Sequence, residues 1–325
     1  MRWKMLMVLV SVLALSAGMA LAAGEDKWPT KPIELVIGFV AGGSADLTAR
    51  AYSPILSKEL GVPVVVVSKP GATGGVAAEY VAKAKPDGYT LFEANITMIS
   101  RRPLTHHVNY TIDNFTYILT HSDSCWGFLV KKDAPWKDYR DFLEYARKNP
   151  GLNYGTAGTY NQAHMVAEWI AKREGLKFSL VPFKGFGAMI PALLGGHIEF
   201  GGVSGGHVPL IEGGKLRTIL QISGEVPDPT PVPYLTDLYP DFPQNLRYLM
   251  GSTSGLMGPK GIPEPIVQKL ANVMRKAVES ESFRNYAKRE KYKIVIMNSA
   301  QIYEAAKKDS ESFGGFLQSL GFKKE

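Results

Sequence analysis

Short apolar stretches alternate with longer amphipathic stretches along most of the chain, and this alternation predicts an α/β protein. Residues 33–38 have the pattern of a strand, and residues 45–60 place apolar side chains at helical spacing. The four valines at 64–67 predict a strand that is buried on both faces of a sheet. A small-residue helix over 74–84 and a strand over 90–95 complete a β-α-β-α-β order, which predicts a parallel sheet covered by helices.

A second set of strands and helices follows. Its strands are predicted at 125–131, 152–156, 178–183, 198–203 and 216–222, and its helices at 136–149, 162–174 and 188–194. A loop rich in Pro, Asp and Tyr at 225–247 precedes strands at 255–258 and 293–297 and helices at 264–280 and 300–320. Because the last helices lack a sheet of their own, we expect one late strand to return to the first sheet.

Such a return makes the chain cross between two α/β units twice, near 119–125 and near 247–256. Two crossings form a hinge, and the cleft at the hinge lies beyond the carboxyl ends of strands, where ligands of such sheets bind. We therefore assign residues 23–120 and 253–325 to a discontinuous first lobe and residues 121–252 to a second lobe.

Residues 1–22 have the pattern of an export signal. Arg2 and Lys4 are basic, the run 5–15 is apolar apart from one serine, and Ala20-Leu21-Ala22 supplies the small-x-small pattern that signal peptidase reads. We expect cleavage near Ala22 and a periplasmic mature protein, and a membrane anchor is the alternative interpretation.

Composition narrows the function classes. With 325 residues, 45% hydrophobic and 21% charged, the chain is globular rather than disordered or fibrous. The single cysteine, Cys125, excludes an intrachain disulfide and a four-cysteine zinc site. The net charge of +7 comes without a run of basic residues, so nucleic acid is not an expected partner. The six histidines show no metal-binding spacing, and we expect neither a metal nor a cofactor.

Two glycine-rich loops could bind an anion. The first, Gly38–Asp46, joins a predicted strand to a helix; its glycines let the backbone approach a ligand, and Ser44 can cap the helix. It lacks the G-x-G-x-x-G fingerprint of dinucleotide sites. The second, Gly155–His164, has the same position in the second unit. Each loop alone is also consistent with a tight strand-to-helix turn, but two helix N-termini opposed across a cleft could hold the two ends of a dicarboxylate.

A third loop, Gly202-Val203-Ser204-Gly205-Gly206, matches the G-x-S-x-G nucleophile elbow of serine hydrolases. The one histidine after Ser204 is His207, which is too close along the chain to be the usual triad base. We therefore interpret this segment as a glycine-rich cleft loop.

Motifs extend along nearly all of the mature chain. They are Trp28-Pro29-Thr30-Lys31-Pro32-Ile33, Phe39…Gly42-Gly43-Ser44-Ala45-Asp46…Arg50, Lys69-Pro70-Gly71-Ala72-Thr73-Gly74-Gly75, Lys85-Pro86-Asp87-Gly88-Tyr89-Thr90, Asn149-Pro150-Gly151-Leu152, Gly155…Gly158…His164, Pro182-Phe183-Lys184-Gly185, Leu193-Leu194-Gly195-Gly196-His197-Ile198-Glu199, Gly214-Lys215-Leu216-Arg217 and Pro259…Gly261-Ile262-Pro263. In this order they resemble the tripartite tricarboxylate transporter receptor family, the Bug-type periplasmic solute-binding proteins.

The resemblance implies a two-lobed, type II periplasmic-binding-protein fold that closes on a small carboxylate. It also implies that the first-lobe loop and the second-lobe loop grip the carboxylate, largely through backbone N–H groups and ordered water. The candidate ligand-binding residues are Phe39, Ala41, Gly42, Gly43, Ser44, Asp46, Thr97, Gly158, Thr159, Tyr160, His164 and Ser204. Whether His164 contacts the ligand or orients its own helix stays open, and Trp126 is interpreted as a core residue with an aromatic platform as the alternative.

The chain departs from the family pattern at three places. Ala41 stands where the family often has proline, Val203 and Ser204 stand where it commonly has an acidic or amide residue, and the stretch 122–126 is unusual. These changes leave room for a bulkier or less cationic ligand, so neither citrate nor an amino acid is carried over.

The expected function is a periplasmic receptor, not an enzyme, that captures a small organic carboxylate as a monomer. It would deliver the ligand to the large and small membrane subunits of a tripartite tricarboxylate-type transporter. A sensor that docks onto a membrane signalling protein is one alternative, and a serine hydrolase that uses Ser204 is another.

Overall fold

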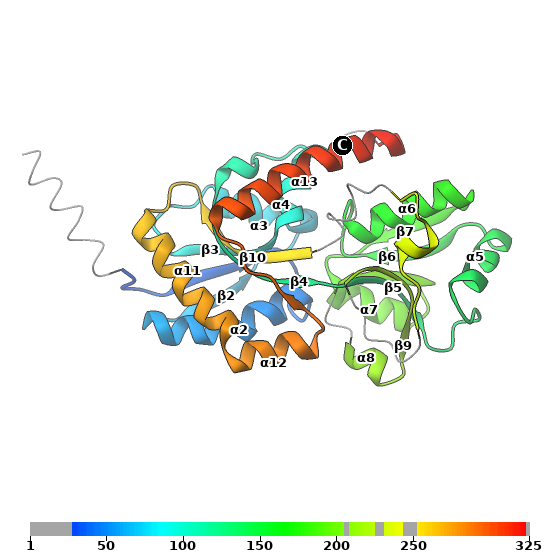
Figure 1. Ribbon diagram of the computed structural model, residues 1–325, viewed down its shortest axis with the longest axis horizontal. Helices are drawn as coiled ribbons and strands as arrows, with labels where there is room; N and C mark the ends of the chain where they lie inside the picture. The colour runs from blue at the N-terminus through cyan, green and yellow to red at the C-terminus, as the bar shows by residue number, and fades with distance from the viewer. Residues whose placement is uncertain (1–27, 205–207, 225–230, 243–251, 323–325) are drawn as a thin grey trace, which may run out of the picture.

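The computed structural model describes residues 28–204, 208–224, 231–242 and 252–322, and the predicted signal at 1–22 lies outside them. Two β-sheets lie side by side, each covered by helices (Figure 1). The two-lobed α/β fold expected from the sequence is confirmed.

The first sheet has the order β11-β4-β10-β3-β1-β2. Its strands are β1 (Ile33–Ile37), β2 (Val64–Ser68), β3 (Thr90–Asn95), β4 (Phe115–Ser124), β10 (Ser252–Pro259) and β11 (Lys293–Ile294). Strand β1 pairs in parallel with β2 and β3, as the β-α-β-α-β pattern predicts. The late strand β10 returns to this sheet and pairs antiparallel with β3 and β4.

The valine run is not buried on both faces, contrary to the sequence prediction. Strand β2 is the edge of the first sheet, and the side chain of Val65 is 49% exposed. A continuous β-branched run shows that a segment favours a strand, but its position within the sheet depends on the pairing of distant strands.

The second sheet has the order β7-β6-β8-β5-β9. Its strands are β5 (Trp126–Lys131), β6 (Leu152–Thr156), β7 (Phe178–Pro182), β8 (Phe200–Ser204) and β9 (Leu216–Ser223). The chain enters this sheet directly, because β4 ends at Ser124 and β5 begins at Trp126, with the buried Cys125 between them. The second crossing was expected near 247–256; residues 247–251 lie outside the described residues, and 252–256 belong to β10.

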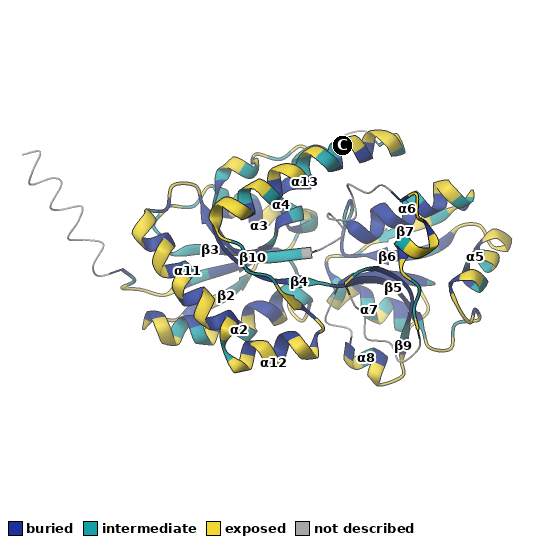
Figure 2. Cartoon of the chain, viewed as in Figure 1, coloured by how far each residue is buried: buried dark blue, intermediate teal, exposed yellow. Residues whose placement is uncertain are grey.

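Helices cover both sheets. They are α2 (Ser44–Leu60), α3 (Gly75–Ala82), α4 (Ile96–Thr105), α5 (Tyr139–Lys148), α6 (Gln162–Glu174), α7 (Phe186–Leu194), α8 (Val208–Glu212), α9 (Leu235–Leu238), α11 (Glu264–Glu279), α12 (Glu281–Arg289) and α13 (Ser299–Leu320), with single 3-10 turns at Ala72–Gly74 and Ile112–Asn114. None of the described helices is long and apolar enough to cross a membrane. Figure 2 shows the strands and the inner helix faces as buried and the outer faces as exposed.

The last helix connects the two halves of the molecule. In Figure 1, α13 runs along one side of the first sheet towards the second. Its residues Phe313, Phe316 and Leu317 belong to the same buried cluster as Tyr160 and Phe200, which lie in the second α/β unit. The C-terminal helix therefore packs on both units.

Candidate functional site

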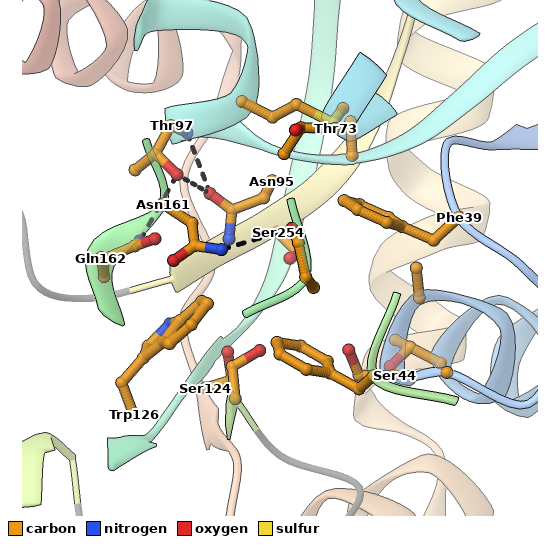
Figure 3. A pocket seen from close by; sticks show the side chains of 18 of the residues that line it. Phe39, Ser44, Thr73, Asn95, Thr97, Ser124, Trp126, Asn161, Gln162 and Ser254 are labelled. Carbon is orange, nitrogen blue, oxygen red and sulfur yellow. Dashed lines mark hydrogen bonds between the residues drawn. The ribbon is translucent and has the colours of Figure 1, made fainter. Parts of the chain in front are cut away.

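A cavity of about 120 Å³ lies between the two sheets. This volume has room for roughly ten water-sized groups, which suits a small organic molecule. Residues of both units line it: Phe39, Gly43, Ser44, Ala45, Thr48, Thr73, Glu93, Ala94, Asn95, Thr97, Met98, Arg101, Arg102, Thr105, His121, Ser122, Ser124, Ser254 and Tyr292 from the first, and Trp126, Ala157, Thr159, Tyr160, Asn161, Gln162, Phe186 and Ser204 from the second. Figure 3 shows the side chains of 18 of these residues arranged around one space.

The N-terminus of α2 opens onto this cavity without a side-chain cap. The N-cap is Gly43, with extended backbone angles, and Ser44 is the first helical residue rather than the cap expected from the sequence. Among the described residues no side chain caps this helix, and Gly43, Ser44 and Ala45 line the cavity. Backbone N–H groups at such a helix start lack intrahelical partners and attract an anion.

Asp46 has a structural part in this loop. Its carboxylate accepts hydrogen bonds from the Gly42 N–H at 3.0 Å and from Arg50 Nε at 2.9 Å. Burial raises the pKa of Asp46, but the bonds from Arg50 and Gly42 outweigh it and the net pKa is lowered. Asp46 is absent from the cavity lining, and it holds the turn that presents Gly43.

In the second loop, hydrogen bonds within the protein already use three of the main-chain N–H groups that the sequence analysis offered to a ligand. The Gly158 N–H donates to the Thr156 carbonyl, the Thr159 N–H donates to Thr73 Oγ1 at 3.2 Å, and the Tyr160 N–H donates to His164 Nδ1 at 2.8 Å. This loop therefore contributes side chains and shape to the cavity wall.

His164 orients its own helix start. Besides accepting from Tyr160, it donates its backbone N–H to the Asn161 side chain, which is the N-cap of α6. Burial lowers its pKa to about 4, so the imidazole is neutral at pH 7. His164 does not line the cavity, and the bond that it accepts fixes the left-handed backbone of Tyr160, whose φ is 57°.

A second uncapped helix start faces α2 from the other unit. Helix α7 begins after Gly185 with no side-chain cap, and its first residue, Phe186, lines the cavity. A Cβ atom built on Gly187 would lie 3.3 Å from the Ala41 carbonyl oxygen and 3.7 Å from the Gly43 nitrogen. The two helix ends therefore meet closely, and like-signed ends in contact favour an anion beside them. The sequence analysis predicted this helix over 188–194, two residues short of its start, but did not place its N-terminus at the ligand site.

The two units also touch through hydrogen bonds at the cavity. Thr73, with a left-handed backbone (φ 51°), accepts from the Thr159 N–H, and Gln162 Nε2 donates to Thr97 Oγ1 at 3.4 Å. A Cβ atom on Gly158 would lie 2.2 Å from Thr73 Oγ1, so this close approach requires glycine. These contacts hold the two units together over the cavity.

Several acidic and basic side chains of the cavity wall contact polar neighbours. Glu93 accepts from Tyr52 at 2.8 Å and lies 2.9 Å from His121 Nε2, while His121 Nδ1 lies 2.8 Å from Ser122 Oγ. Arg101 forms a buried ion pair with Asp309 of α13 at 2.8 Å. Burial, together with the neighbouring Glu93, holds the pKa of Tyr52 well above its usual value.

Five Phe, Trp and Tyr side chains contribute to the wall, among them Tyr160 and Tyr292. Phe39 comes from the first loop, and Trp126 and Phe186 pack edge to face with ring centroids 5.8 Å apart. Trp126 is 5% exposed, and its Nε1 has no hydrogen-bond partner among the described residues. Trp126 is thus a buried residue that also forms part of the cavity surface. The sequence analysis had given a core residue and an aromatic platform as alternatives.

Of the residues predicted from sequence, seven line the cavity and five do not. Those in the lining are Phe39, Gly43, Ser44, Thr97, Thr159, Tyr160 and Ser204. Those outside it are Ala41, Gly42, Asp46, Gly158 and His164, which shape the two loops.

The elbow-like segment is described only in part, since residues 205–207, which include His207, lie outside the described residues. Ser204 ends β8, is buried and lines the cavity. No described histidine hydrogen-bonds Ser204, and the His121 ring nitrogens lie against Glu93 and Ser122. Within the described part of the chain, no group of three or more His, Cys, Asp or Glu side chains could hold a metal ion.

Sequence comparison identifies relatives over most of the chain. A family model described as the tripartite tricarboxylate transporter family receptor matches residues 48–322. A "UPF0065 protein in gbd 5'region" from Cupriavidus necator is 35% identical over 313 residues, covering 95% of this chain and 93% of the relative. The protein BugT of Bordetella pertussis is 25% identical over 292 residues, covering 87% of each chain.

Solved structures share the whole architecture. The structure of a periplasmic transporter is 28% identical with a TM-score of 0.83, covering 91% of this chain and 99% of that one. Two Rhodopseudomonas palustris proteins share the fold at 23% identity: one solved with adipate, at a TM-score of 0.83 over 92% of this chain and 100% of that one, and MatC with bound malate, at 0.75 over 89% and 100%. The chain therefore belongs to the tripartite tricarboxylate transporter receptor family, the Bug-type periplasmic solute-binding proteins.

Proposed function

We propose that this protein captures a small organic carboxylate in the cavity between its two units. The observation that carries the proposal is the N-terminus of α2, whose first turn has no side-chain cap and lines a cavity closed by the opposite unit. A carboxylate there accepts charge-assisted hydrogen bonds from fixed N–H groups in a water-poor space, where such bonds are strong.

Two features add support. The uncapped start of α7 meets the same site from the second unit, so an anion links both halves and favours the closed state. Adipate and malate are the molecules bound in two proteins of this fold, and both are small carboxylates.

Calorimetry with the purified protein tests the proposal. Carboxylates of four to eight carbons are compared with the corresponding uncharged amides, and the carboxylates alone should bind and raise the melting temperature. A panel in which amides bind as well as their acids would contradict an anion site, as would silence across all carboxylates. Mass spectrometry of small molecules that co-purify with the protein gives an independent identification of the ligand class.

We further propose that the receptor acts as a monomer in the periplasm, after cleavage near Ala22, and delivers its ligand to the large and small membrane subunits of a tripartite tricarboxylate-type transporter. The family description supports transport as the purpose of binding.

Uptake of the identified ligand by cells lacking the protein tests this proposal. Lost uptake supports delivery to a transporter. Intact uptake together with a lost transcriptional response favours a sensor. The intact mass of the periplasmic form tests the cleavage site.

Ser204 is proposed to contact the ligand rather than to act as a nucleophile. Esterase activity that disappears in Ser204→Ala would overturn this assignment.

A further inference from the structure

The strand that crosses between the two units forms part of the cavity wall. Strand β4 ends at Ser124 and β5 begins at Trp126, so the chain runs directly from the first sheet into the second. Ser122, Ser124 and Trp126, at alternate positions of this crossing, line the cavity, whereas the residues between them do not. Alternate residues of a strand lie on the same face, so the crossing presents one face to the space that a ligand would occupy.

Two further serines lie on this face. Ser254 of β10 is opposite Ser122, Ser204 of β8 is opposite Trp126, and both serines line the cavity. Ser124 is therefore the diagonal neighbour of each, and diagonal neighbours in an antiparallel pair are roughly 7 Å apart. In Figure 3, Ser124 and Ser254 lie around the same space as Trp126. We call Ser124, Ser204 and Ser254 the serine cluster.

The hydroxyls of the serine cluster are available to a ligand. Within the part of the chain that the structure describes, no group forms a hydrogen bond with them, and each oxygen keeps accessible surface. Ser204 is nevertheless only 5% exposed. Ser122 differs, because its hydroxyl lies 2.8 Å from His121 Nδ1. A purely apolar ligand body over the serine cluster would displace water and leave buried hydroxyls unsatisfied, which is unfavourable.

The chemistry of the serine cluster indicates the group that it binds. Its members belong in part to the places where the chain departs from the family pattern, the stretch 122–126 and Ser204. A ligand hydroxyl both donates and accepts, as each serine does, so a hydroxyl over Ser124 can accept from one serine and donate to another. A site built to hydrogen-bond a hydroxyl discriminates against the analogue that lacks it.

We infer that the ligand is a hydroxy carboxylate, whose carboxylate binds at the start of α2 and whose hydroxyl binds to Ser124 and a diagonal neighbour, Ser204 or Ser254. This inference rests on the proposed carboxylate receptor and adds a second recognised group. It makes the serine cluster the specificity-determining part of the site. The rings of Phe39 and Phe186 provide apolar wall for the carbon chain of the ligand.

Paired acids test the inference by calorimetry. The tightest-binding monocarboxylate of the panel above is compared with derivatives in which one hydroxyl replaces a hydrogen at successive carbons, and with the dicarboxylate of the same length. One derivative should bind roughly three- to tenfold more tightly than its parent, the value of a net hydrogen bond, and more tightly than the dicarboxylate.

Variants assign this preference to the serine cluster. In Ser124→Ala the ratio of the affinities of the preferred derivative and its parent should fall to about one, and Ser204→Ala or Ser254→Ala should lower it too. Ser179→Ala, at an exposed position of β7 outside the lining, is the matched control and should keep the wild-type ratio. Gly43→Asn should weaken both acids and also keep the ratio, because it acts on the carboxylate end.

The outcomes separate this inference from the proposed function. The inference is overturned, with the carboxylate receptor intact, if no hydroxy derivative binds better than its parent or if the preference survives in Ser124→Ala. A dicarboxylate that binds more tightly than every hydroxy derivative, or dicarboxylates that bind while all monocarboxylates fail, also overturns it. Absence of binding by every carboxylate removes the proposed function itself.

Discussion

The N-cap of α2 is Gly43, which has no side chain to accept a hydrogen bond from the first N–H groups of the helix. Glycine there leaves the first turn of α2 open to the cavity, although its φ of −86° and ψ of 172° suit any N-cap residue. At residue 164 the chain does the reverse, since a buried histidine accepts a loop N–H that could otherwise contact a ligand. Gly43 thus leaves backbone N–H groups available to a ligand, whereas His164 accepts a hydrogen bond from the Tyr160 N–H.

Supplying the missing cap should separate folding from binding. In Gly43→Asn the new side chain can accept from the first turn, so the free energy of unfolding should stay level or rise by a few tenths of a kcal/mol. Carboxylate affinity should fall at least roughly tenfold, because cap and ligand compete for the same N–H groups. Urea unfolding and calorimetry measure the two effects.

Gly43→Ala is the matched control, since its Cβ would lie 3.5 Å from the Val40 carbonyl oxygen and cannot cap. Equal losses of affinity in both variants would show that space, not the donors, matters at this position.

The buried histidine should make stability depend on pH. Its pKa is about 4 in the folded protein against 6.5 when unperturbed, so between these values the unfolded chain binds a proton that the folded chain rejects. The contribution is full above pH 6.5, declines as the pH falls, and is lost by about pH 4, amounting to about 3 kcal/mol. Urea unfolding from pH 7.5 to 4 measures this decline.

His164→Asn keeps an acceptor at the equivalent side-chain position and cannot be protonated, so this part of the slope should disappear. His197→Asn, at an exposed position, should retain it. A slope that survives in His164→Asn would assign the pH dependence to other groups.

At the scale of elements, α4 and α13 are held together by a buried charged contact. Asp309 of α13 accepts hydrogen bonds from Ser100 and Arg101 of α4, and Arg101 and Thr97 of α4 line the cavity. The far end of α13 packs into the core of the second unit. The contact thus connects a wall of the site to the helix that spans both units.

Removing one partner of this contact should be strongly destabilising. Asp309→Ala leaves the Arg101 guanidinium buried without its carboxylate, and the free energy of unfolding should fall by about 3 to 5 kcal/mol. Chemical denaturation followed by circular dichroism measures the loss.

The exposed pair of Glu59 and Lys276, 2.7 Å apart, provides the comparison. Glu59→Ala should leave the unfolding midpoint unchanged, because exposed pairs are screened by solvent. Similar effects of both variants would contradict the role given to burial.

At the scale of the whole molecule, closure depends on a few close approaches between the two units. Gly158 lies against Thr73, Gly187 lies against Ala41, and Gln162 reaches Thr97. Such contacts exist in the closed arrangement and are lost when the units separate, so they bias the equilibrium to which a ligand couples.

Gly158→Ala should weaken binding through this equilibrium. The added methyl group would lie 2.2 Å from Thr73 Oγ1, so the units must move apart, and ligand affinity should fall more than roughly tenfold. Small-angle scattering should show a more open form of the variant at saturating ligand, and calorimetry measures the affinity.

Gly175→Ala separates this clash from backbone strain. Gly175 also has a positive φ, of 66°, but no atom lies within 4 Å of its Cβ position, so the variant should lose stability without losing affinity. If both alanine variants weakened binding equally, strain rather than contact between the units would explain the effect.

Much of the architecture followed from local pattern. Periods of apolar residues and the glycines at turns predicted both α/β units and the return of a late strand, because these signals depend on a few neighbouring residues. The sequence missed β4 and α4, whose stretches 115–124 and 96–105 mix polar and apolar residues without a clear period. It also predicted the helix at 136–149 three residues too early, since Asp138 caps the α5 helix.

The sequence by itself determined that two glycine-rich loops, one in each unit, precede helices, and that the chain belongs with two-lobed receptors. Only the tertiary structure decided which of their N–H groups remain available, because Asn161, His164 and Thr73 satisfy the second loop while Gly43 leaves the first open. It also brought α7 and Trp126 to the cavity. The physical reason is that hydrogen-bond partners and burial arise between residues far apart in the chain, whereas periodicity and turn chemistry are local.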